Sequence, residues 1–243
     1  VIQTVKVTYQ VMKQEKRWVK HKEKEGRKRG KMKIKQDFVY KGTRILFGDK
    51  AKYKRYIIDT CIDILEKEGY NEIVIPIIQF QSTFVSKVGA ENQQMMYTFK
   101  DRGDRDVCLA PEYTAVIQLL ANTQFKFQKD VKLFYVVECF RGEKPQKGRY
   151  RQFTQLGVEI INPSKDYVMD LAYLASKLIL NKTGDINNQK INFGVTRGLD
   201  YYKGGEGFEI EIDSLGAQKQ VCGGGEYEGG VGFAIGIDRL MEA

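Results

Sequence analysis

Two stretches of the chain have the apolar spacing of amphipathic helices. Residues 51–68 and residues 164–181 place apolar side chains three or four positions apart, so one face of each helix can be buried. Ser164 is of a type favoured as an N-cap, and Gly69 and Gly184 follow the two stretches, as is usual at helix C-termini. The positions predicted to be buried are Tyr53, Ile57, Cys61, Ile64 and Leu65 in the first helix and Val168, Leu171, Leu174, Ala175, Leu178 and Ile179 in the second.

Other stretches predict strands. The apolar run at residues 133–137 predicts a buried strand, and a polar loop containing glycine and proline connects it to a second strand at residues 151–160. In that second strand Gln155, Gly157 and Glu159 alternate with apolar residues, so one face is polar and the other apolar. Further strands are predicted at residues 4–11, at 71–76 (ended by Pro76), near Ile191, and at 206–213 with Phe208, Ile210 and Ile212 facing inward.

The hairpin at residues 133–160 gathers polar and charged side chains. The alternation predicts that Arg141, Glu143, Gln155 and Glu159 form a polar floor on the sheet. Guanidinium groups offer forked donors that match phosphate oxygens, so the loop above this floor is suited to a polyphosphate. The alternative for this pattern is a solvated hairpin with a charged tip. The cations of the loop are Lys144, Lys147, Arg149 and Arg151.

Composition limits the classes of protein that fit. The chain has 243 residues, 42% of them hydrophobic and 29% charged, which suits one globular domain with an appendage. No apolar run is long enough for a membrane span, and the N-terminus lacks a signal-peptide core. The isolated cysteines exclude a disulfide framework or a zinc spacing, and the single histidine, His21, excludes His-based metal or triad chemistry. We expect a reducing compartment, either the cytoplasm or an organelle matrix such as the mitochondrial one.

Positive charge is concentrated at the N-terminus. Residues 1–36 contain 13 Lys and Arg against 3 Glu, whereas residues 37–243 hold the other 27 Lys and Arg against 28 Asp and Glu. Such a separation predicts a basic extension that contacts RNA phosphates, with Trp18 as a stacking surface. A solvated tail is the alternative.

Several motifs resemble one protein family. The run EKPQKGRYRQF at residues 143–153 closely resembles motif 2 of class II aminoacyl-tRNA synthetases in its histidyl-tRNA synthetase form. The runs TRGLDYYKG at 196–204 and VGFAIGIDRL at 231–240 resemble that family's arginine–glycine–leucine–aspartate–tyrosine–tyrosine signature and its motif 3. MYTFKDR, LAPEYTA and the glycine-rich VCGGGEYEGG, a turn in the family, also have counterparts there. The resemblance extends from Lys41 to Leu240.

The resemblance implies a fold and an assembly. The expected fold class is α+β, a class II synthetase-like antiparallel sheet flanked by helices. A catalytic domain at residues 37–243 would follow the basic extension at 1–36. The helix and strand at residues 51–76 look like motif 1, which implies a homodimer. The family's inserted domain and its anticodon-binding domain are not expected in this chain.

The resemblance also implies a reaction. Histidine would be activated by ATP with Mg²⁺ to histidyl adenylate and then transferred to tRNA, which makes histidine, ATP and tRNA or another RNA the expected partners. Catalytic roles would fall to Arg197 and Arg141. The other implied contacts are Arg141, Glu143, Arg149, Arg151, Phe153 and Arg239 for ATP; Glu112, Thr114, Gln155, Glu159, Tyr201 and Tyr202 for histidine; and Gln146 and Lys147 for tRNA, with no metal ligand assigned to the protein.

Two positions depart from the family pattern by the loss of an arginine, and Glu228 stands where the family has aspartate. Ala110 and Glu226 stand where the family has arginine. An inactive paralogue is therefore the alternative, either an RNA-binding structural component of a ribonucleoprotein such as a ribosome, or a regulatory subunit. Against it, the arginines and the carboxylate expected around ATP are retained, and unpaired charges in a cleft are costly without a ligand.

Overall fold

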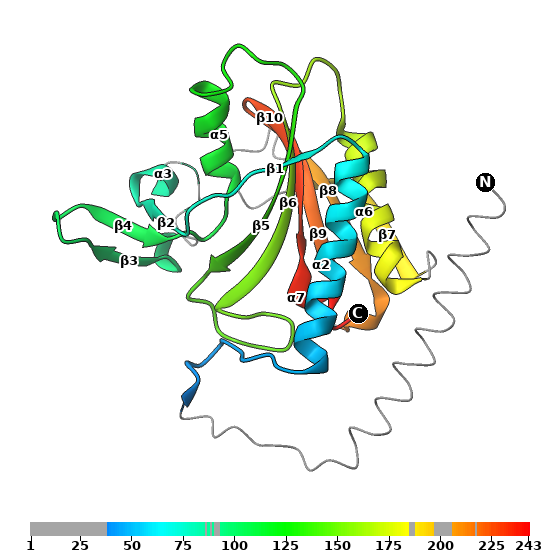
Figure 1. The fold of residues 1–243 in the computed structure, drawn as a ribbon, viewed down its shortest axis with the longest axis horizontal. Helices are drawn as coiled ribbons and strands as arrows, with labels where there is room; N and C mark the ends of the chain where they lie inside the picture. The colour runs from blue at the N-terminus through cyan, green and yellow to red at the C-terminus, as the bar shows by residue number, and fades with distance from the viewer. Residues whose placement is uncertain are drawn as a thin grey trace. The chain divides into compact units, whose positions relative to one another are not determined.

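A large sheet carries the chain's main core and is seen edge-on in the middle of Figure 1. The computed structural model describes residues 38–85, 87, 89, 93–184, 188–196, 206–216 and 218–243. The basic extension and the strand expected at 4–11 thus lie outside the described residues. Within the described part the strand order is β1-β5-β6-β10-β9-β8-β7, antiparallel at each pairing except β1 with β5. The strands are β1 (Asn71–Glu72), β5 (Val131–Phe140), β6 (Gln152–Ile161), β7 (Gln189–Thr196), β8 (Glu206–Ile212), β9 (Gln220–Tyr227) and β10 (Gly230–Gly236).

Two long helices cover one face of this sheet. Helix α2 (Asp49–Lys67) and helix α6 (Val168–Thr183) pack beside each other, and the short α7 (Ile237–Leu240) follows β10 (Figure 1). Leu156, Val158 and Ile160 of β6 turn toward the helices, so the apolar half of the predicted alternation builds this core. Other members are Ile57, Cys61, Leu65, Leu171, Ala175, Leu178, Ile179, Phe208, Ile210 and Ile212, all predicted to be buried.

A second, smaller sheet lies on the left of Figure 1. Its strands are β2 (Ile78–Phe80), β4 (Asp106–Leu109) and β3 (Tyr97–Lys100), in that order. Helices α3 (Ser82–Val85) and α5 (Thr114–Asn122) accompany it, and the turn η4 (Asp213–Leu215) follows β8. A second apolar cluster joins this part to the large sheet and includes Phe84, Ala110, Tyr113 and Ile117.

The second helix begins later than the sequence predicts. Instead of capping a helix, Ser164 bonds to Asp130 through its backbone N–H (2.8 Å) and its hydroxyl (2.6 Å). Asp166 accepts the N–H of Val168 (2.8 Å), and the helix starts there. Gly184 ends it in the left-handed conformation, as predicted (φ 67°).

Two other expectations were wrong in detail. The strand predicted at 71–76 pairs only at Asn71 and Glu72, because the chain leaves the sheet edge before Pro76 and Val74 turns to solvent. The glycine-rich stretch expected as a turn is strand β9. A Cβ at Gly224 would lie 2.5 Å from the carbonyl oxygen of Gly232, so glycine allows β9 and β10 to pack closely.

The predicted fold class is confirmed: a mostly antiparallel sheet flanked by helices, in an α+β chain. The hairpin of β5 and β6 is regular over its full length, from the pair Val131 with Ile161 to the pair Phe140 with Gln152. Among the described residues, no helix is both long and apolar enough to cross a membrane.

Candidate active site

A cavity of about 530 Å³ lies on the face of the large sheet opposite the two long helices. Its floor comes from β6, β8, β9 and β10, and its walls from the loop between β5 and β6 and the start of α5. Gln155 and Glu159 reach it because they alternate along β6 with the residues that face the helices. Nine of the residues predicted to bind ATP or histidine line it together: Glu112, Thr114, Arg141, Glu143, Arg149, Phe153, Gln155, Glu159 and Arg239.

Glu159 is the most deeply placed carboxyl group of the cavity. Only 2% of its surface is exposed, and it accepts hydrogen bonds from the hydroxyls of Tyr135 (2.9 Å) and Tyr227 (2.8 Å). Burial raises its pKa to about 8, although the tyrosine hydroxyls act in the opposite direction and the charge of Glu112 adds to the rise. A carboxyl group with a pKa this close to neutral pH can hydrogen-bond to a polar ligand and gain or lose its proton when the ligand binds.

Glycines make the space that Glu159 and Tyr135 occupy. A Cβ at Gly232, which pairs with Glu159 across the strands, would lie 1.7 Å from its carboxyl oxygen Oε2. A Cβ at Gly157, which pairs with Tyr135, would lie 2.1 Å from that ring. Neither position admits a side chain without displacing a residue that lines or supports the cavity.

Glu112 is held at the start of α5. Its carboxylate accepts the backbone N–H groups of Thr114 (2.7 Å) and Ala115 (3.0 Å), which are free donors at the beginning of a helix. The carboxyl group is therefore fixed in direction at a helix terminus, a place that favours negative charge. An ammonium group in the cavity would find a preoriented acceptor there.

The opposite part of the cavity is cationic. The Nε of Arg141 donates to the Pro111 carbonyl (2.9 Å), and its guanidinium lies 5.3 Å from the centroid of the Phe153 ring. Arg149 and Glu143 form an ion pair (2.7 Å). The residues that line this part thus combine two fork-shaped donors with a half-buried aromatic ring, which suits phosphates and a flat ring.

Arg239 projects from α7 into the same wall. Its Nε donates to the Gly148 carbonyl of the hairpin loop (3.0 Å), and its other nitrogens donate to the Gln220 carbonyl and the Gln218 side chain. Burial, and next the charge of Arg149, lower its pKa. A polyanion would relieve this repulsion between the two arginines.

Three further predicted residues, Arg151, Gln146 and Lys147, are described by the structure and do not line the cavity. Arg151 points away from it and donates to the carbonyls of Glu143 (3.0 Å) and Lys41 (3.3 Å) and to the Tyr40 hydroxyl (3.1 Å). Of the two loop arginines predicted to contact ATP, Arg149 lines the cavity and Arg151 does not. Gln146 and Lys147 are exposed at the tip of the loop, and Arg197, Tyr201 and Tyr202 fall outside the described residues.

Sequence reasoning missed several residues of this site. Tyr135 and Tyr227 donate hydrogen bonds to Glu159. They lie in β5 and β9, whose sequences are apolar and glycine-rich, respectively. The signal that could have found Tyr135 is Gly157, since a glycine inside an apolar strand often marks close approach by a neighbour. Thr154, Glu209, Glu211 and Asp238 also line the cavity.

The departure at Ala110 leaves the local backbone intact. Ala110 is fully buried in the second apolar cluster. Its N–H donates to the Ile77 carbonyl (3.0 Å), and its carbonyl accepts the N–H of Phe140 (3.0 Å). The segment that leads to Glu112 is thus held on both sides without an arginine.

Comparisons with known proteins agree on one family. The family model described as histidyl-tRNA synthetase matches residues 42–174. The histidine–tRNA ligases of Methanosarcina acetivorans and Archaeoglobus fulgidus are each 30% identical over 77% of this chain and 68% of their own length. That of Thermosipho africanus is 38% identical, over 60% of this chain and 36% of its own length.

Solved structures give the same answer. The apo histidyl-tRNA synthetase of S. aureus is 26% identical with a TM-score of 0.64, over 84% of this chain and 68% of that one. A Bacillus halodurans protein described as an ATP phosphoribosyltransferase regulatory subunit/histidyl-tRNA synthetase has a TM-score of 0.66 at 17% identity, over 83% and 81%, a likeness of fold alone. By its motifs, its matched family model and its relatives, the chain belongs to the histidyl-tRNA synthetase family.

Proposed function

We propose that this chain activates histidine with ATP and transfers it to tRNA. The observation that carries the proposal is the arrangement of the cavity, which places two buried carboxyl groups at one side and three arginines at the other. Histidine has an ammonium and an imidazole for the first side, and ATP has phosphates for the second. Family membership supports the same reaction.

Each ligand has proposed contacts. Glu112 and Thr114 receive the ammonium of histidine, and Glu159 with its two tyrosine partners receives the imidazole. The adenine ring stacks on Phe153, with Glu143 accepting from its amino group. Arg141 holds the α-phosphate, and Arg149 and Arg239 bracket the outer phosphates. Gln155 is the proposed polar neighbour of histidine, and Arg197, Tyr201 and Tyr202 remain predicted members of the site.

The reaction is an in-line displacement at phosphorus. A carboxylate oxygen of histidine attacks the α-phosphorus and forms the new O–P bond, while the bond from that phosphorus to the bridging oxygen breaks. Pyrophosphate leaves with the electron pair. The chain contributes positioning and fixed positive charge, since negative charge accumulates on the phosphoryl oxygens. No covalent link to the protein is needed.

Mg²⁺ enters with ATP as part of the substrate in this proposal. Among the described residues no group of three or more potential ligands is preassembled. Mg²⁺ characteristically keeps several waters and binds through substrate phosphates and one or two carboxylates. Glu209 and Glu211 line the cavity and are the proposed candidates for that contact.

The chain offers a surface for a homodimer. Val74, Ile78 and Phe80 are exposed apolar residues on and beside β1 and β2, directly after helix α2. They border a groove lined by Ile73, Ile75 and other apolar residues. Exposed apolar patches of this kind favour association, so we propose a homodimer through the 51–76 region and the adjoining β2.

RNA contacts are proposed at two places. Gln146 and Lys147, exposed at the hairpin tip, meet the acceptor end of tRNA, and residues 1–36 form a basic arm on the RNA phosphates.

A compartment with reduced thiols, the cytoplasm or an organelle matrix, fits the four buried and unbridged cysteines. The likeness to the B. halodurans protein is one of fold, so it does not favour a regulatory subunit.

Histidine-dependent exchange of pyrophosphate into ATP tests the proposal. The unaltered chain should exchange only when histidine is present. Arg239→Ala should lower the exchange rate by about 10²-fold, because one fixed charge at the phosphates is lost. Arg102→Ala removes an exposed arginine from the β3–β4 hairpin and should exchange normally. Exchange without histidine, or unchanged exchange and ATP affinity in folded Arg239→Ala, would contradict the proposal.

A further inference from the structure

A second hollow of about 550 Å³ lies behind the cavity, between α2 and strands β5 and β6. Thr154 of β6 and Asp238 of α7 line both hollows. Both are almost fully buried. At this point a single layer of residues therefore separates the proposed ATP site from the underside of helix α2.

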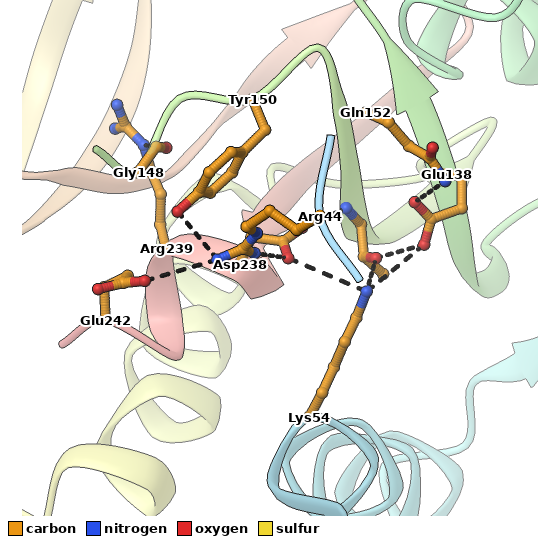
Figure 2. Close-up of polar contacts among 10 residues, drawn as sticks. Arg44, Lys54, Glu138, Gly148, Tyr150, Gln152, Asp238, Arg239 and Glu242 are labelled. Carbon is orange, nitrogen blue, oxygen red and sulfur yellow. Dashed lines mark hydrogen bonds and ion pairs between the residues drawn. The ribbon is translucent and has the colours of Figure 1, made fainter. Parts of the chain in front are cut away.

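Charged residues meet around both side chains, and Figure 2 shows those that surround Asp238. The ammonium of Lys54, on α2, donates to the Thr154 hydroxyl and lies 3.6 Å from Glu138 and 3.9 Å from Asp238. The Thr154 hydroxyl in turn donates to Glu138, which also accepts from Gln152 (3.3 Å). Lys54 is thus the contact that connects helix α2 to both carboxylates.

Asp238 connects the same network to the hairpin loop. It accepts the backbone N–H of Thr154 (2.5 Å) and pairs with Arg44. The guanidinium of Arg44 also lies 3.7 Å from the centroid of the Tyr150 ring, donates to the Tyr150 hydroxyl (2.9 Å) and approaches Glu242 (3.5 Å) (Figure 2). Asp238 thereby fixes α7 against β6, and Arg44 fixes the loop against α7.

Each buried member of the network is a chain neighbour of a proposed ATP contact. Thr154 lies directly between Phe153 and Gln155 on β6, and Asp238 directly precedes Arg239 on α7. Their side chains turn into the network while these neighbours line the cavity. A shift of Thr154 or Asp238 therefore moves the adenine platform and the phosphate arginine together.

We infer that Lys54 is a positioning residue for ATP, acting through Thr154 and Asp238 on Phe153 and Arg239. The inference rests on the proposed function. Lys54 is the contact from α2 to this buried pair, and a buried carboxylate that loses its cation is left uncompensated. Without Lys54, Glu138 and Asp238 face each other across Thr154 with Arg44 alone as counter-charge, and only the Thr154 N–H still ties Asp238 to β6.

The test compares variants of the full chain in the exchange assay and in ATP binding by calorimetry. Lys54→Met removes the charge and keeps much of the volume of the side chain. Lys52→Met makes the same change two residues earlier, on an exposed face of α2, and is the matched control. Lys54→Arg restores the cation. Thermal melts select a temperature at which every variant is folded.

We expect Lys54→Met to raise the KM and Kd for ATP by about tenfold, less than the ~10²-fold effect that a misplacement of about 1 Å can have. The KM for histidine should change far less, because Glu112 and Glu159 have their own partners. Lys54→Arg should recover most of the ATP affinity, and Lys52→Met should match the unaltered chain.

Two results would overturn the inference, and they are distinguishable. Equal KM and Kd for ATP in folded Lys54→Met and Lys52→Met, with an active unaltered chain, would show that Lys54 serves stability alone. Absence of ATP binding by the unaltered chain would overturn the proposed function and the inference with it.

Discussion

At the residue scale, two features of the surroundings of Glu159 shift its pKa in opposite directions. A buried carboxyl group resists ionisation, yet its two tyrosine hydroxyls are donors that suit a carboxylate. The balance leaves a pKa of about 8, so in the free chain the group is largely protonated near neutral pH. Its charge state then responds to whatever enters the cavity.

The raised pKa has a consequence for folding. The folded chain holds a proton on Glu159 up to about pH 8, whereas an ordinary glutamate loses it near 4.5. The raised pKa of Glu159 therefore contributes to the free energy of unfolding. This contribution is fully present below about pH 4.5 and is lost as the pH rises through about 8. We expect the free energy of unfolding of the unaltered chain to fall, relative to that of Glu159→Gln, between about pH 5 and about pH 8.

Denaturant titrations at several pH values measure this difference. Glu66→Gln, an exposed carboxylate on α2 that carries the same chemical change, should leave the difference from the unaltered chain nearly independent of pH. Parallel stability curves for Glu159→Gln and the unaltered chain across this range would show that Glu159 titrates normally.

The sequence could predict the polar residues proposed to contact the ligands. It could not predict the residues that hydrogen-bond to those contacts and hold them in place. Glu112 and Glu159 were reachable through motifs and alternation. Tyr135 was not, because a tyrosine in a buried strand looks like any aromatic core residue until the partner strand's register is known. Thr154 and Asp238 were missed for the same reason, since their roles arise from segments more than eighty residues apart.

At the element scale, the edge of the large sheet at β1 has little strand pairing and is followed by exposed apolar residues. Strand β1 pairs over two residues only, and the segment after it turns apolar side chains outward, with Val74 88% exposed and Phe80 54% exposed. The periodicity correctly predicted helix α2, because one face of it is buried within the chain. It failed for the strand at 71–76, where Ile75 is buried in the second apolar cluster but Val74 faces solvent and the chain leaves the sheet edge.

Those exposed residues allow a direct test of the proposed dimer. The double variant Val74→Asp with Phe80→Asp should be monomeric at concentrations where the unaltered chain is dimeric, because charges do not bury against an apolar partner surface. Sedimentation velocity measures the change. Met169→Asp with Tyr173→Asp alters two exposed apolar residues of α6 and should remain dimeric. A dimer that survives in the first variant would place the interface elsewhere.

At the scale of the whole molecule, the excess positive charge is concentrated in the first 36 residues of the sequence. Residues 37–243 are nearly balanced, with 27 basic and 28 acidic side chains, and residues 1–36 carry an excess of ten positive charges. Residues 40–243 form one compact unit with its own core. The fold of that unit was predictable from its motifs and periodicity, because local pattern and family resemblance agree over its length.

The excess charge gives a prediction for RNA. A chain that starts at residue 37 should bind tRNA more weakly, and its affinity should depend less steeply on salt, because fewer counterions are released on binding. Fluorescence anisotropy at several salt concentrations gives the two slopes. Histidine-dependent pyrophosphate exchange should be unchanged, as an internal control for folding. Equal slopes would assign the RNA contacts to the compact unit alone.

The glycines of the cavity floor limit how the site can change over evolutionary time. Gly223, Gly232 and Gly236 line it from β9 and β10, and a glycine can only gain atoms when it mutates. Drift at these positions therefore never enlarges the cavity, and at Gly232 the first added atom would displace Glu159. A descendant of this chain that accepted a bulkier amino acid would have to gain room by shortening larger lining residues, such as Gln155 or Phe153.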